Sequence, residues 1–243
     1  MSTTFDYLVI GAGSSGCVIA AQLSANGRFR VLLLEAGGPD KNFWIGVPNG
    51  VAKLVANPKQ IWTYSVTQPR ERGAAAREVW IRGKGIGGSS SVNGMIWSRG
   101  EPADYDAWEA LGCPGWNARS MIANLNALED HGLGPGPMRG TSGPVSVSPK
   151  IFDYPLAQKM VEAGAEIGLV AVDDLNAQAG DRVGYYAHNI KRGRRVSSAA
   201  AFLTPARGRA NLTVITNATA ERITFEGRRA TGVEARVNGA PRR

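Results

Sequence analysis

Three glycines spaced for phosphate binding follow directly on an apolar stretch near the amino terminus. Residues 5–10 form a short apolar run, which predicts a strand buried on both faces. Gly11, Gly13 and Gly16 follow at once, and residues 17–24 carry apolar side chains at helical spacing. Glycines let the backbone approach a pyrophosphate, and the start of a helix offers unpaired N–H groups and a partial positive charge. This stretch therefore predicts a phosphate site.

An acidic residue lies where the ribose of a bound dinucleotide would need one. Residues 31–34 are a second apolar run that ends on Glu35, 19 residues after Gly16. A carboxylate at this distance from the glycines accepts hydrogen bonds from an adenosine ribose. Together with the strand, glycine turn and helix, it predicts a βαβ unit that binds an adenine dinucleotide. The alternative is a glycine-rich turn in an unrelated α/β protein.

A second glycine-rich stretch spans residues 82–100. Five glycines occur in thirteen positions, and three serines and Asn93 lie among them. Paired glycines allow close backbone approach, and the polar side chains offer hydrogen bonds to a polar group. The sequence then resumes with Val92, Met95, Ile96 and Trp97. We expect a loop that closes on a ligand and leads straight into buried structure.

Composition and charge set the class of protein. The chain has 243 residues, of which 43% are hydrophobic and 20% charged, with a formal net charge of +8. These values are ordinary for a globular chain. Basic residues cluster at 191–195, 228–229 and 242–243. They lack interleaved aromatics and any nucleic-acid motif, so we expect solvated surface charge, or one arginine near a phosphate, and no nucleic acid.

The sequence contains neither a transmembrane pattern nor a signal-peptide pattern. No apolar stretch is long enough to span a bilayer, and no basic region precedes the first apolar run. Cys17 and Cys113 are the two cysteines, without metal-ligand spacing, which fits a reducing compartment and predicts a cytoplasmic protein without a metal site. Cys17 is expected to fill core space on the first helix.

Periodicity and turn residues predict elements along the rest of the chain. Residues 40–75 are expected to be an irregular excursion over the surface, as a lid over a ligand would be, apart from a strand at 62–66. Aromatic residues there are as well explained as loop anchors as by a substrate role. The other predicted elements are helices at 106–111, 119–128 and 154–167, an exposed strand at 144–148, a strand at 211–216 continued by 218–223, and a hairpin of 222–225 with 232–237.

The second glycine stretch resembles the first signature of the glucose–methanol–choline (GMC) oxidoreductases, which are FAD flavoproteins. The match runs from Gly83-Lys84 through Gly87-Gly88-Ser89-Ser90 and Val92-Asn93 to Trp97, Gly100 and Asp106. The run 104–108, the amino-terminal GAGSSG and the turn at 34–38 are also similar to the family. The resemblance covers essentially the whole chain, but only the amino-terminal portion of the family.

This resemblance implies a set of FAD contacts. Glu35 would bind the adenosine ribose, and Ala220 would contact the adenine through its backbone, at a position that is usually valine in the family. Some relatives attach the flavin through a histidine that aligns with Val92, so non-covalent FAD is expected here. The complete set implied is Gly11, Gly13, Ser14, Ser15 and Gly16 at the pyrophosphate, Glu35 and Ala36 after the second strand, Gly83, Gly87, Gly88 and Ser89 in the second loop, Asn93, Gly94, Met95 and Ile96 along the isoalloxazine ring, and Ala220.

The implied fold is α/β, a Rossmann-like FAD-binding domain with part of a second, antiparallel-sheet substrate domain. FAD-binding segments are expected at about 1–110 and 191–243, and the partial substrate domain at about 144–190. Because the second sheet would be incomplete, we expect an open strand edge, exposed apolar surface and self-association.

The implied function is oxidation of the CH–OH group of an alcohol by hydride transfer to flavin, with a small-molecule alcohol as substrate. In the family, the catalytic histidine lies near the carboxyl end of a longer chain. His131 and His188 have no motif around them and are expected to be structural, so no catalytic residue is predicted. The alternative is a catalytically inactive FAD-binding fragment. The sequence leaves open the alcohol, the electron acceptor and the distinction between dehydrogenase and oxidase.

Overall fold

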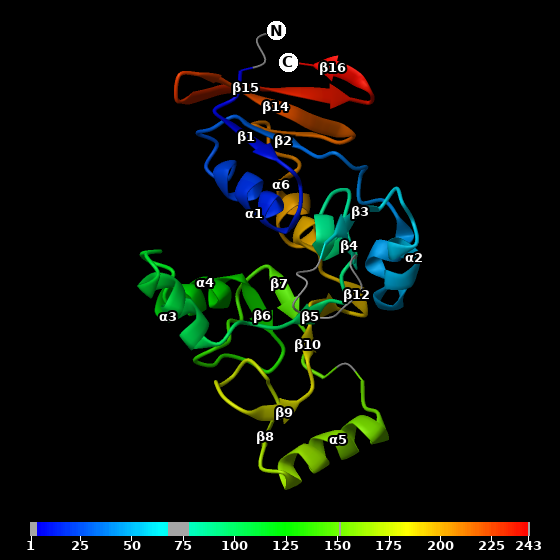
Figure 1. Cartoon of the computed structure of the whole chain (residues 1–243), viewed down its shortest axis with the longest axis vertical. Coiled ribbons are helices and arrows are strands. Elements are labelled where there is room, and N and C mark those ends of the chain that lie inside the picture. The colour runs from blue at the N-terminus through cyan, green and yellow to red at the C-terminus, as the bar shows by residue number, and fades with distance from the viewer. Residues whose placement is uncertain (1–3, 68–77, 151, 243) are drawn as a thin grey trace. The chain divides into compact units, whose positions relative to one another are not determined.

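The computed structural model divides the chain into two compact units, which are described separately (Figure 1). Unit 1 comprises Met1–Gly94 and Ser197–Arg243, and unit 2 comprises Met95–Val196. The assignment of a cofactor role to one and a substrate role to the other remains a prediction. The structure describes residues 4–67, 78–150 and 152–242.

A parallel sheet forms the centre of unit 1. Its order is β1 (Tyr7–Ile10), β2 (Val31–Leu34) and β13 (Leu212–Ile215), with β2 in the middle. The four residues of β2 are all buried, as expected for an apolar strand between two neighbours. Helix α1 (Ser14–Leu23) connects β1 to β2 and buries Cys17, which confirms the predicted βαβ unit and the place of Cys17 in the core.

The prediction that the first strand is buried on both faces is wrong. Tyr7, Leu8 and Ile10 are 41%, 38% and 48% exposed. Among the described residues, β1 pairs only with β2, so it is an edge strand with its apolar side chains toward solvent. An apolar run indicates a strand but does not reveal whether anything covers it.

A long antiparallel hairpin covers the parallel sheet. β14 (Ala218–Glu226) pairs with β15 (Arg229–Val237), which also pairs with β16 (Ala240–Arg242) (Figure 1). Ala218, Val233 and Ala235 pack with Leu32 and Leu34 in one hydrophobic cluster. The predicted hairpin is confirmed, with the correction that β14 is a separate strand and does not continue β13.

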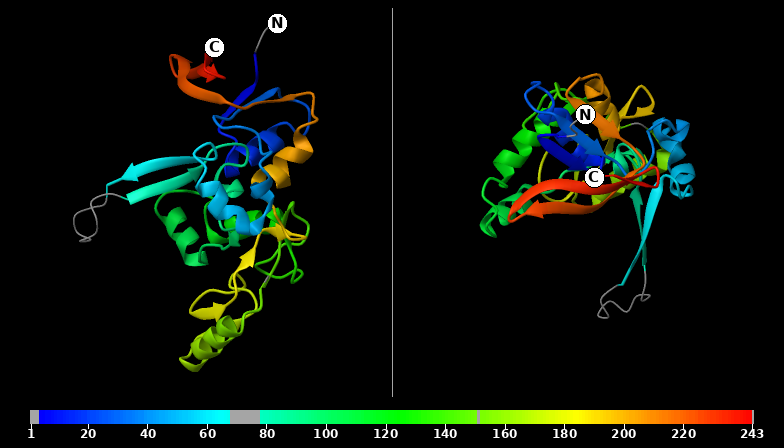
Figure 2. Two further views of the ribbon diagram at one scale, coloured as in Figure 1. Left: turned by 90° about the vertical axis from the view of Figure 1, so that its right-hand side faces the viewer. Right: turned by 90° about the horizontal axis from the view of Figure 1, so that it is seen from above.

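The segment between β2 and the second glycine stretch is more regular than predicted. It contains the short helices η1 (Phe43–Gly46), η2 (Pro48–Gly50) and α2 (Val51–Val55), then β3 (Ile61–Val66) and β4 (Glu78–Gly83). β3 and β4 pair antiparallel, and Figure 2 shows them as a hairpin that extends outward. The strand expected at 62–66 is confirmed, and residues 68–75 of the predicted excursion lie outside the described residues.

Two short helical segments complete unit 1. η4 (Gly88–Ser91) follows the glycine turn after β4, and the π-helical segment η5 (Ala199–Leu203) runs into α6 (Thr204–Ala206). The hydroxyl of Ser90 accepts from the backbone N–H of Ser198 at 3.0 Å. The two separate stretches of unit 1 are therefore joined beside the glycine loop.

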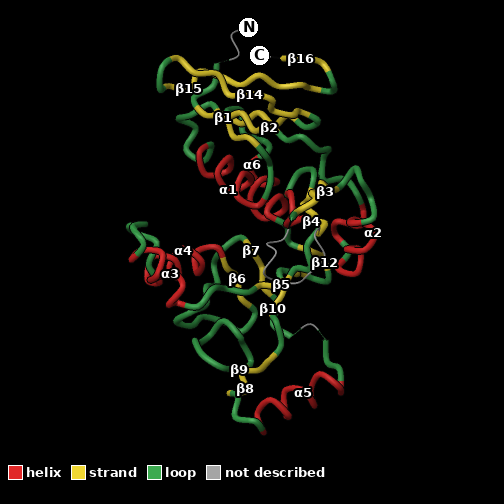
Figure 3. The backbone as a smooth tube through the Cα atoms, in the orientation of Figure 1, coloured by secondary structure: helices red, strands yellow, loops and turns green. Residues whose placement is uncertain are grey.

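Unit 2 combines helices with short strands (Figure 3). The helices are α3 (Pro102–Ala110), α4 (Ala118–Leu128) and α5 (Pro155–Glu166). The strands are β5 (Ile96–Trp97), β6 (Glu129–His131), β7 (Val145–Val147), β8 (Val170–Val172), β9 (Arg182–Gly184), β10 (Ala187–His188), β11 (Ile190–Lys191) and β12 (Arg194–Arg195). β5 pairs antiparallel with β10, whereas β6–β7 and β8–β9 are short parallel pairs. The predicted helices are confirmed with small shifts of their ends, but the strand expected to be exposed at 144–148 is buried along all of β7.

A buried ionic cluster joins loops and strands of unit 2. Arg99 Nη2 lies 2.6 Å from Glu129 Oε2, and both side chains are almost fully buried. The Trp97 indole N–H also donates to Glu129, and Arg139 pairs with the buried Asp174 at 3.0 Å. Removing one partner of such a pair leaves an uncompensated buried charge, so these contacts specify how the loops pack. Within the described ranges, no helix is both long and apolar enough to cross a lipid bilayer.

Candidate dinucleotide-binding site

The two glycine loops of unit 1 lie directly against each other. The backbone N–H of Gly87 donates to the carbonyl of Ala12 at 2.7 Å. A Cβ atom on Gly88 would lie 2.6 Å from Gly13 Cα, and one on Gly16 would overlap the Gly11 carbonyl. Glycine at 16 therefore permits close packing of α1 against the turn after β1, and glycine at 88 permits the contact between the loops.

The Glu35 carboxylate ties the two loops together. It is 6% exposed and accepts three backbone hydrogen bonds. Oε2 accepts from Ala12 N–H at 2.8 Å, and Oε1 accepts from Gly37 N–H at 2.8 Å and from Gly85 N–H at 3.0 Å. Each carboxylate oxygen offers about two acceptor sites, so Oε2 retains one. The ribose contact stays a prediction, and these hydrogen bonds give Glu35 a second role, joining the two loops, that its place in the motif does not reveal.

A cavity of about 290 Å³ opens where these loops meet the ends of the parallel strands. It lies at the carboxyl ends of β1 and β2, where ligands bind in open α/β sheets. Its volume is near the lower end of the ~300–1,000 Å³ range of small-molecule sites. The lining residues are Ile10, Gly11, Gly13, Leu34, Glu35, Ala36, Trp62, Gly83, Gly88, Ala218, Thr219 and Ala220.

Seven of the residues singled out from the sequence line this cavity. They come from four separate parts of the chain and are Gly11, Gly13, Glu35, Ala36, Gly83, Gly88 and Ala220. Sequence reasoning missed Ile10 and Leu34, which end the two strands. For Trp62 it left open whether the side chain anchors a loop or faces a substrate, and it did not predict a place in this cavity. It also missed Ala218 and Thr219, which precede Ala220 on β14. Hairpin pairing brings Trp62 opposite Arg82, one residue before Gly83, and no local motif reveals that pairing.

The helix that follows the first loop fits an anionic group. α1 begins at Ser14 after Gly13, and neither a side-chain cap nor an acidic residue occupies its first turn. Ser14 and Ser15 are exposed. A Cβ atom on Gly13 would meet no described heavy atom within 4 Å, so this glycine faces open space. Free N–H groups and a positive helix end beside a bare backbone fit a pyrophosphate.

The serine hydroxyls of the second loop mainly form hydrogen bonds with the backbone of the same loop. Ser89 Oγ accepts from Gly83 N–H at 3.0 Å, and the hydroxyls of Ser90 and Ser91 donate to the carbonyls of Gly87 and Ile86. Gly87 is left-handed, with φ of +91°. The hydroxyls of Ser90 and Ser91 thus take part in the structure of unit 1, and a contact of these hydroxyls with a ligand stays a prediction. Neither Gly87 nor Ser89 lines the cavity.

The four residues expected along a flavin ring are divided between the units. Asn93 and Gly94 end the first stretch of unit 1 and are exposed. Met95 and Ile96 belong to unit 2, where Met95 is buried with a φ of +64° and Ile96 is 51% exposed. The backbone of a non-glycine residue is strained at a positive φ, and residues strained in this way cluster at functional sites.

Both histidines lie in unit 2. His131 is 3% exposed, and its Nδ1 accepts from Leu133 N–H at 3.2 Å. Burial lowers the pKa of His131, against the opposing effects of Asp174 and Glu129. Burial also lowers the pKa of His188, which lies on β10 opposite Ile96. Among the described residues, no three His, Cys, Asp or Glu side chains come together as a metal site would require.

Comparison with known proteins gives a family match over nearly the whole chain. The model of the family described as GMC oxidoreductase matches residues 5–242. The oxygen-dependent choline dehydrogenase of Ectopseudomonas mendocina (strain ymp) is 40% identical over 99% of this chain and 43% of its own length. The corresponding protein of Yersinia pestis (strain Pestoides F) is 42% identical over 94% of this chain and 41% of its own length. The chain thus spans less than half the length of these relatives.

Solved structures share the fold. The crystal structure of pyridoxine 4-oxidase from Mesorbium loti superposes with a TM-score of 0.92 at 32% identity, over 98% of this chain and 47% of that chain. An FAD-dependent oxidoreductase from Chaetomium thermophilum has a TM-score of 0.84 at 27% identity, over 96% of this chain and 42% of that chain. The α/β fold expected from the sequence is confirmed by these neighbours.

Proposed function

Because the chain belongs to the GMC oxidoreductase family, we propose that it binds FAD in the unit 1 cavity and forms the cofactor-binding portion of an enzyme that oxidises a small alcohol. The observation that carries the proposal is the meeting of both glycine loops, Glu35 and Ala220 around one cavity. These residues fit a dinucleotide because they combine a bare backbone, a helix amino terminus and a buried acceptor.

Each part of the cavity is assigned a role in this proposal. Gly11, Gly13 and the amino terminus of α1 would hold the pyrophosphate, and Gly88 would close the same site from the second loop. The remaining acceptor site of Glu35 Oε2 would take a ribose hydroxyl. Ala36, Gly83 and Ala220 would lie along the nucleotide. The other expected contacts are Ser14, Ser15, Gly16, Gly87 and Ser89 near the phosphates and Asn93, Gly94, Met95 and Ile96 along the flavin ring.

FAD is proposed to bind without a covalent bond. Val92 stands where some relatives of the family have the histidine that links the flavin, and it is 7% exposed. A hydrocarbon side chain offers no nucleophile to the flavin. The protein would therefore hold the cofactor by hydrogen bonds and packing alone, and denaturation should release it intact.

The chemistry proposed is hydride transfer from the CH–OH carbon of an alcohol. Flavin, when bound, supplies the hydride acceptor, and this chain supplies binding and orientation. Neither His131 nor His188 is assigned the role of base, because His131 is buried in an ionic cluster and His188 has no motif around it. The base would come from sequence that corresponds to the rest of the relatives' length. The alternative is an FAD-binding portion without catalytic activity.

The proposed substrate is a small alcohol, because the names of the relatives refer to small alcohols. Those names are choline dehydrogenase and pyridoxine 4-oxidase. The electron acceptor is left open. A cytoplasmic location is proposed because Cys17 and Cys113 are free thiols, as in a reducing compartment.

Complementation separates the two alternatives. The chain would be co-expressed with the part of the Ectopseudomonas relative that lies beyond the match, and the complex loaded with FAD. Bleaching of the flavin absorbance by choline or pyridoxine under anaerobic conditions supports the oxidoreductase. The full-length relative is tested in parallel, and its flavin should be bleached. If the complex binds FAD but neither alcohol bleaches its flavin, the result favours an FAD-binding portion without activity.

A further inference from the structure

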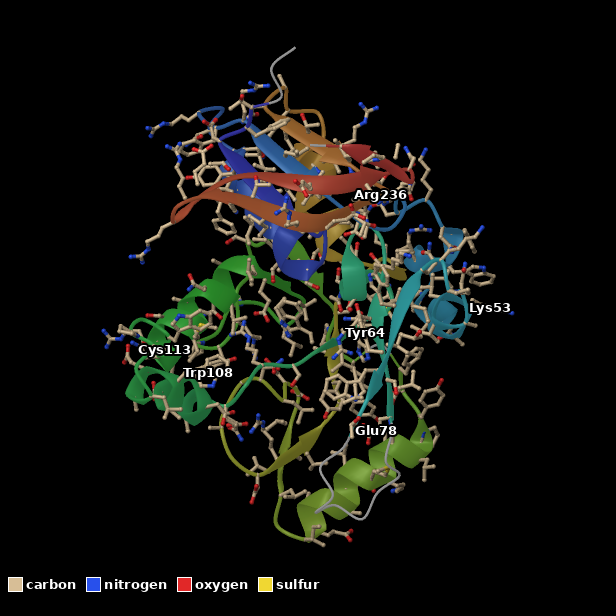
Figure 4. The ribbon with its side chains drawn as sticks, turned by 45° about the horizontal axis from the view of Figure 1, so that its top comes forward. Lys53, Tyr64, Glu78, Trp108, Cys113 and Arg236 are labelled. Carbon is tan, nitrogen blue, oxygen red and sulfur yellow. The ribbon has the colours of Figure 1, made fainter. Side chains whose placement is uncertain are left out.

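Trp62 forms a side wall of the cavity, although no motif singled it out. It lies on β3, is half-buried, and lines the cavity together with Gly83 and Gly88 of the second loop. Its neighbours outward along the same hairpin, Tyr64 and Trp80, are 51% and 45% exposed and do not line the cavity. Figure 4 labels Tyr64 on this hairpin. The cavity position is therefore specific to Trp62 among the aromatics of the hairpin.

Lys84 holds the indole from one side. Its Nζ lies 4.1 Å from the centroid of the Trp62 ring, well within the distance of a cation–π contact. The Lys84 backbone is fixed by its N–H, which donates to the Gln60 carbonyl at 2.8 Å, on the residue before β3. Among the residues described, no carboxylate pairs with the Lys84 ammonium. The cation–π contact with Lys84 therefore limits how the indole ring turns.

The chemistry of this wall suits one part of a dinucleotide. An indole presents a large, rigid π face, and such faces stack on nucleobases of any type. The cation beside it adds positive potential near the glycine loops, where phosphate is expected.

We propose that Trp62 contacts the adenosine diphosphate part of FAD and that Lys84 is a positioning residue, which acts by holding the indole. This inference rests on the proposed FAD site in unit 1. It names a contact that lies outside both glycine motifs, on a strand separated from the first loop by some fifty residues of sequence (13 to 62).

Two titrations of the full chain test the contact. FAD affinity is measured by the flavin signal, and tryptophan emission is followed during titration with ADP to saturation, as judged by competition with FAD. ADP carries the adenosine and the pyrophosphate but does not absorb the emission, so a change reports contact. We expect Trp62→Leu to weaken FAD binding about tenfold, the scale of one lost base–aromatic stack, and Trp62→Phe to weaken it less while abolishing the ADP-dependent change.

Trp80→Phe is the matched control, since it removes a tryptophan from the same hairpin away from the cavity; it should change neither readout. Lys84→Gln should shift the emission maximum of the free chain and reduce FAD affinity, and Lys84→Arg should restore both. Circular dichroism confirms that each variant is folded, and Trp62→Phe retains an aromatic ring if Trp62→Leu fails to fold.

The outcomes for the two proposals are distinct. If the wild-type chain binds FAD and Trp62→Phe leaves the ADP-dependent emission change intact, the inference is overturned while the FAD site stands. Equal FAD affinity of Trp62→Leu and wild type overturns it in the same way. If the folded wild-type chain binds neither FAD nor ADP, the proposed function fails and this inference fails with it.

Discussion

At the scale of single residues, Glu35 carries more structure than its place in a dinucleotide motif implies. Its carboxylate accepts backbone hydrogen bonds from Ala12, Gly37 and Gly85, at 2.8, 2.8 and 3.0 Å. Two of these donors belong to the two glycine loops. A buried anion that satisfies three donors contributes to stability before any ligand binds, because each unsatisfied donor costs free energy.

Glu35→Gln tests this double role. The amide would direct an N–H₂ group at a backbone N–H, so at least one hydrogen bond is lost. We expect the free energy of unfolding of the apo chain to fall by about 1.5–3 kcal/mol, measured by urea titration. Glu221→Gln, at an exposed cross-strand pair with Arg236, is the control and should change stability little. Unchanged stability of Glu35→Gln would contradict a role of this carboxylate in stabilising the apo chain.

His131 predicts a pH dependence of stability. Its Nδ1 accepts a backbone hydrogen bond, and burial lowers its pKa in the folded chain. The unfolded chain therefore binds this proton at higher pH, near the ordinary value of about 6.5. As pH falls below that value, protonation favours the unfolded chain and the free energy of unfolding decreases, until the pH passes the lower folded pKa.

We expect the melting temperature of the wild type to fall when the pH is lowered from about 7 to about 5. The fall should be smaller in His131→Gln. His188, whose pKa burial also lowers, contributes in the same direction and accounts for part of the remaining slope. A His131→Gln variant with the full wild-type slope would contradict the neutral, buried state assigned to this residue.

At the scale of elements, the two glycine loops contain glycines of two kinds. Gly13 has a φ of −76° and open space at its Cβ position, whereas Gly88 has a φ of +51° and lies against Gly13 Cα. The first kind leaves room for a ligand, and the second allows the loops to touch. Substitutions at the two positions should therefore separate ligand binding from folding.

Gly13→Ala should fold with an unfolding free energy within about 0.5 kcal/mol of wild type and bind FAD at least tenfold more weakly. Gly88→Ala should lose about 1–3 kcal/mol of stability, since the added methyl overpacks the loop contact. Urea titration and flavin fluorescence measure the two effects. A Gly13→Ala chain that binds FAD like wild type would mean that the pyrophosphate does not approach this backbone.

The sequence was informative where a local pattern dictates the element. The first strand, helix and second strand, the hairpin of residues 222–225 with 232–237 and the four longest helices follow from periodicity and turn residues. Seven predicted site residues line one cavity. Exposure was not predictable, because the continuous apolar run of β1 is largely exposed whereas the alternating Val-Ser-Val of β7 is buried. Trp62 was missed since its place depends on pairing between β3 and β4.

At the scale of the whole molecule, the exposed edge of the parallel sheet predicts self-association. β1 pairs on one side only among the described residues, and Tyr7, Leu8 and Ile10 lie substantially exposed on it. An open apolar edge strand is a template for pairing with another chain. We therefore expect the isolated chain to form oligomers that grow with protein concentration.

Leu8→Lys places a charge on this edge and should lower the average mass measured by light scattering after size exclusion. Ile19→Lys, on the exposed face of α1, is the control and should leave the mass unchanged. A monomeric wild-type chain at high concentration, or an oligomer that Leu8→Lys does not affect, would contradict self-association through β1.

The most direct test of the central claim is whether the purified, folded chain binds FAD by itself. The chain is mixed with excess FAD, separated from free cofactor by size exclusion, and its visible absorbance recorded before and after acid precipitation. We predict a flavin spectrum that elutes with the protein and passes entirely into the acid supernatant, as expected for non-covalent FAD in the cavity of unit 1. A chain that is folded by circular dichroism yet elutes without flavin would contradict the assignment of that cavity as an FAD site.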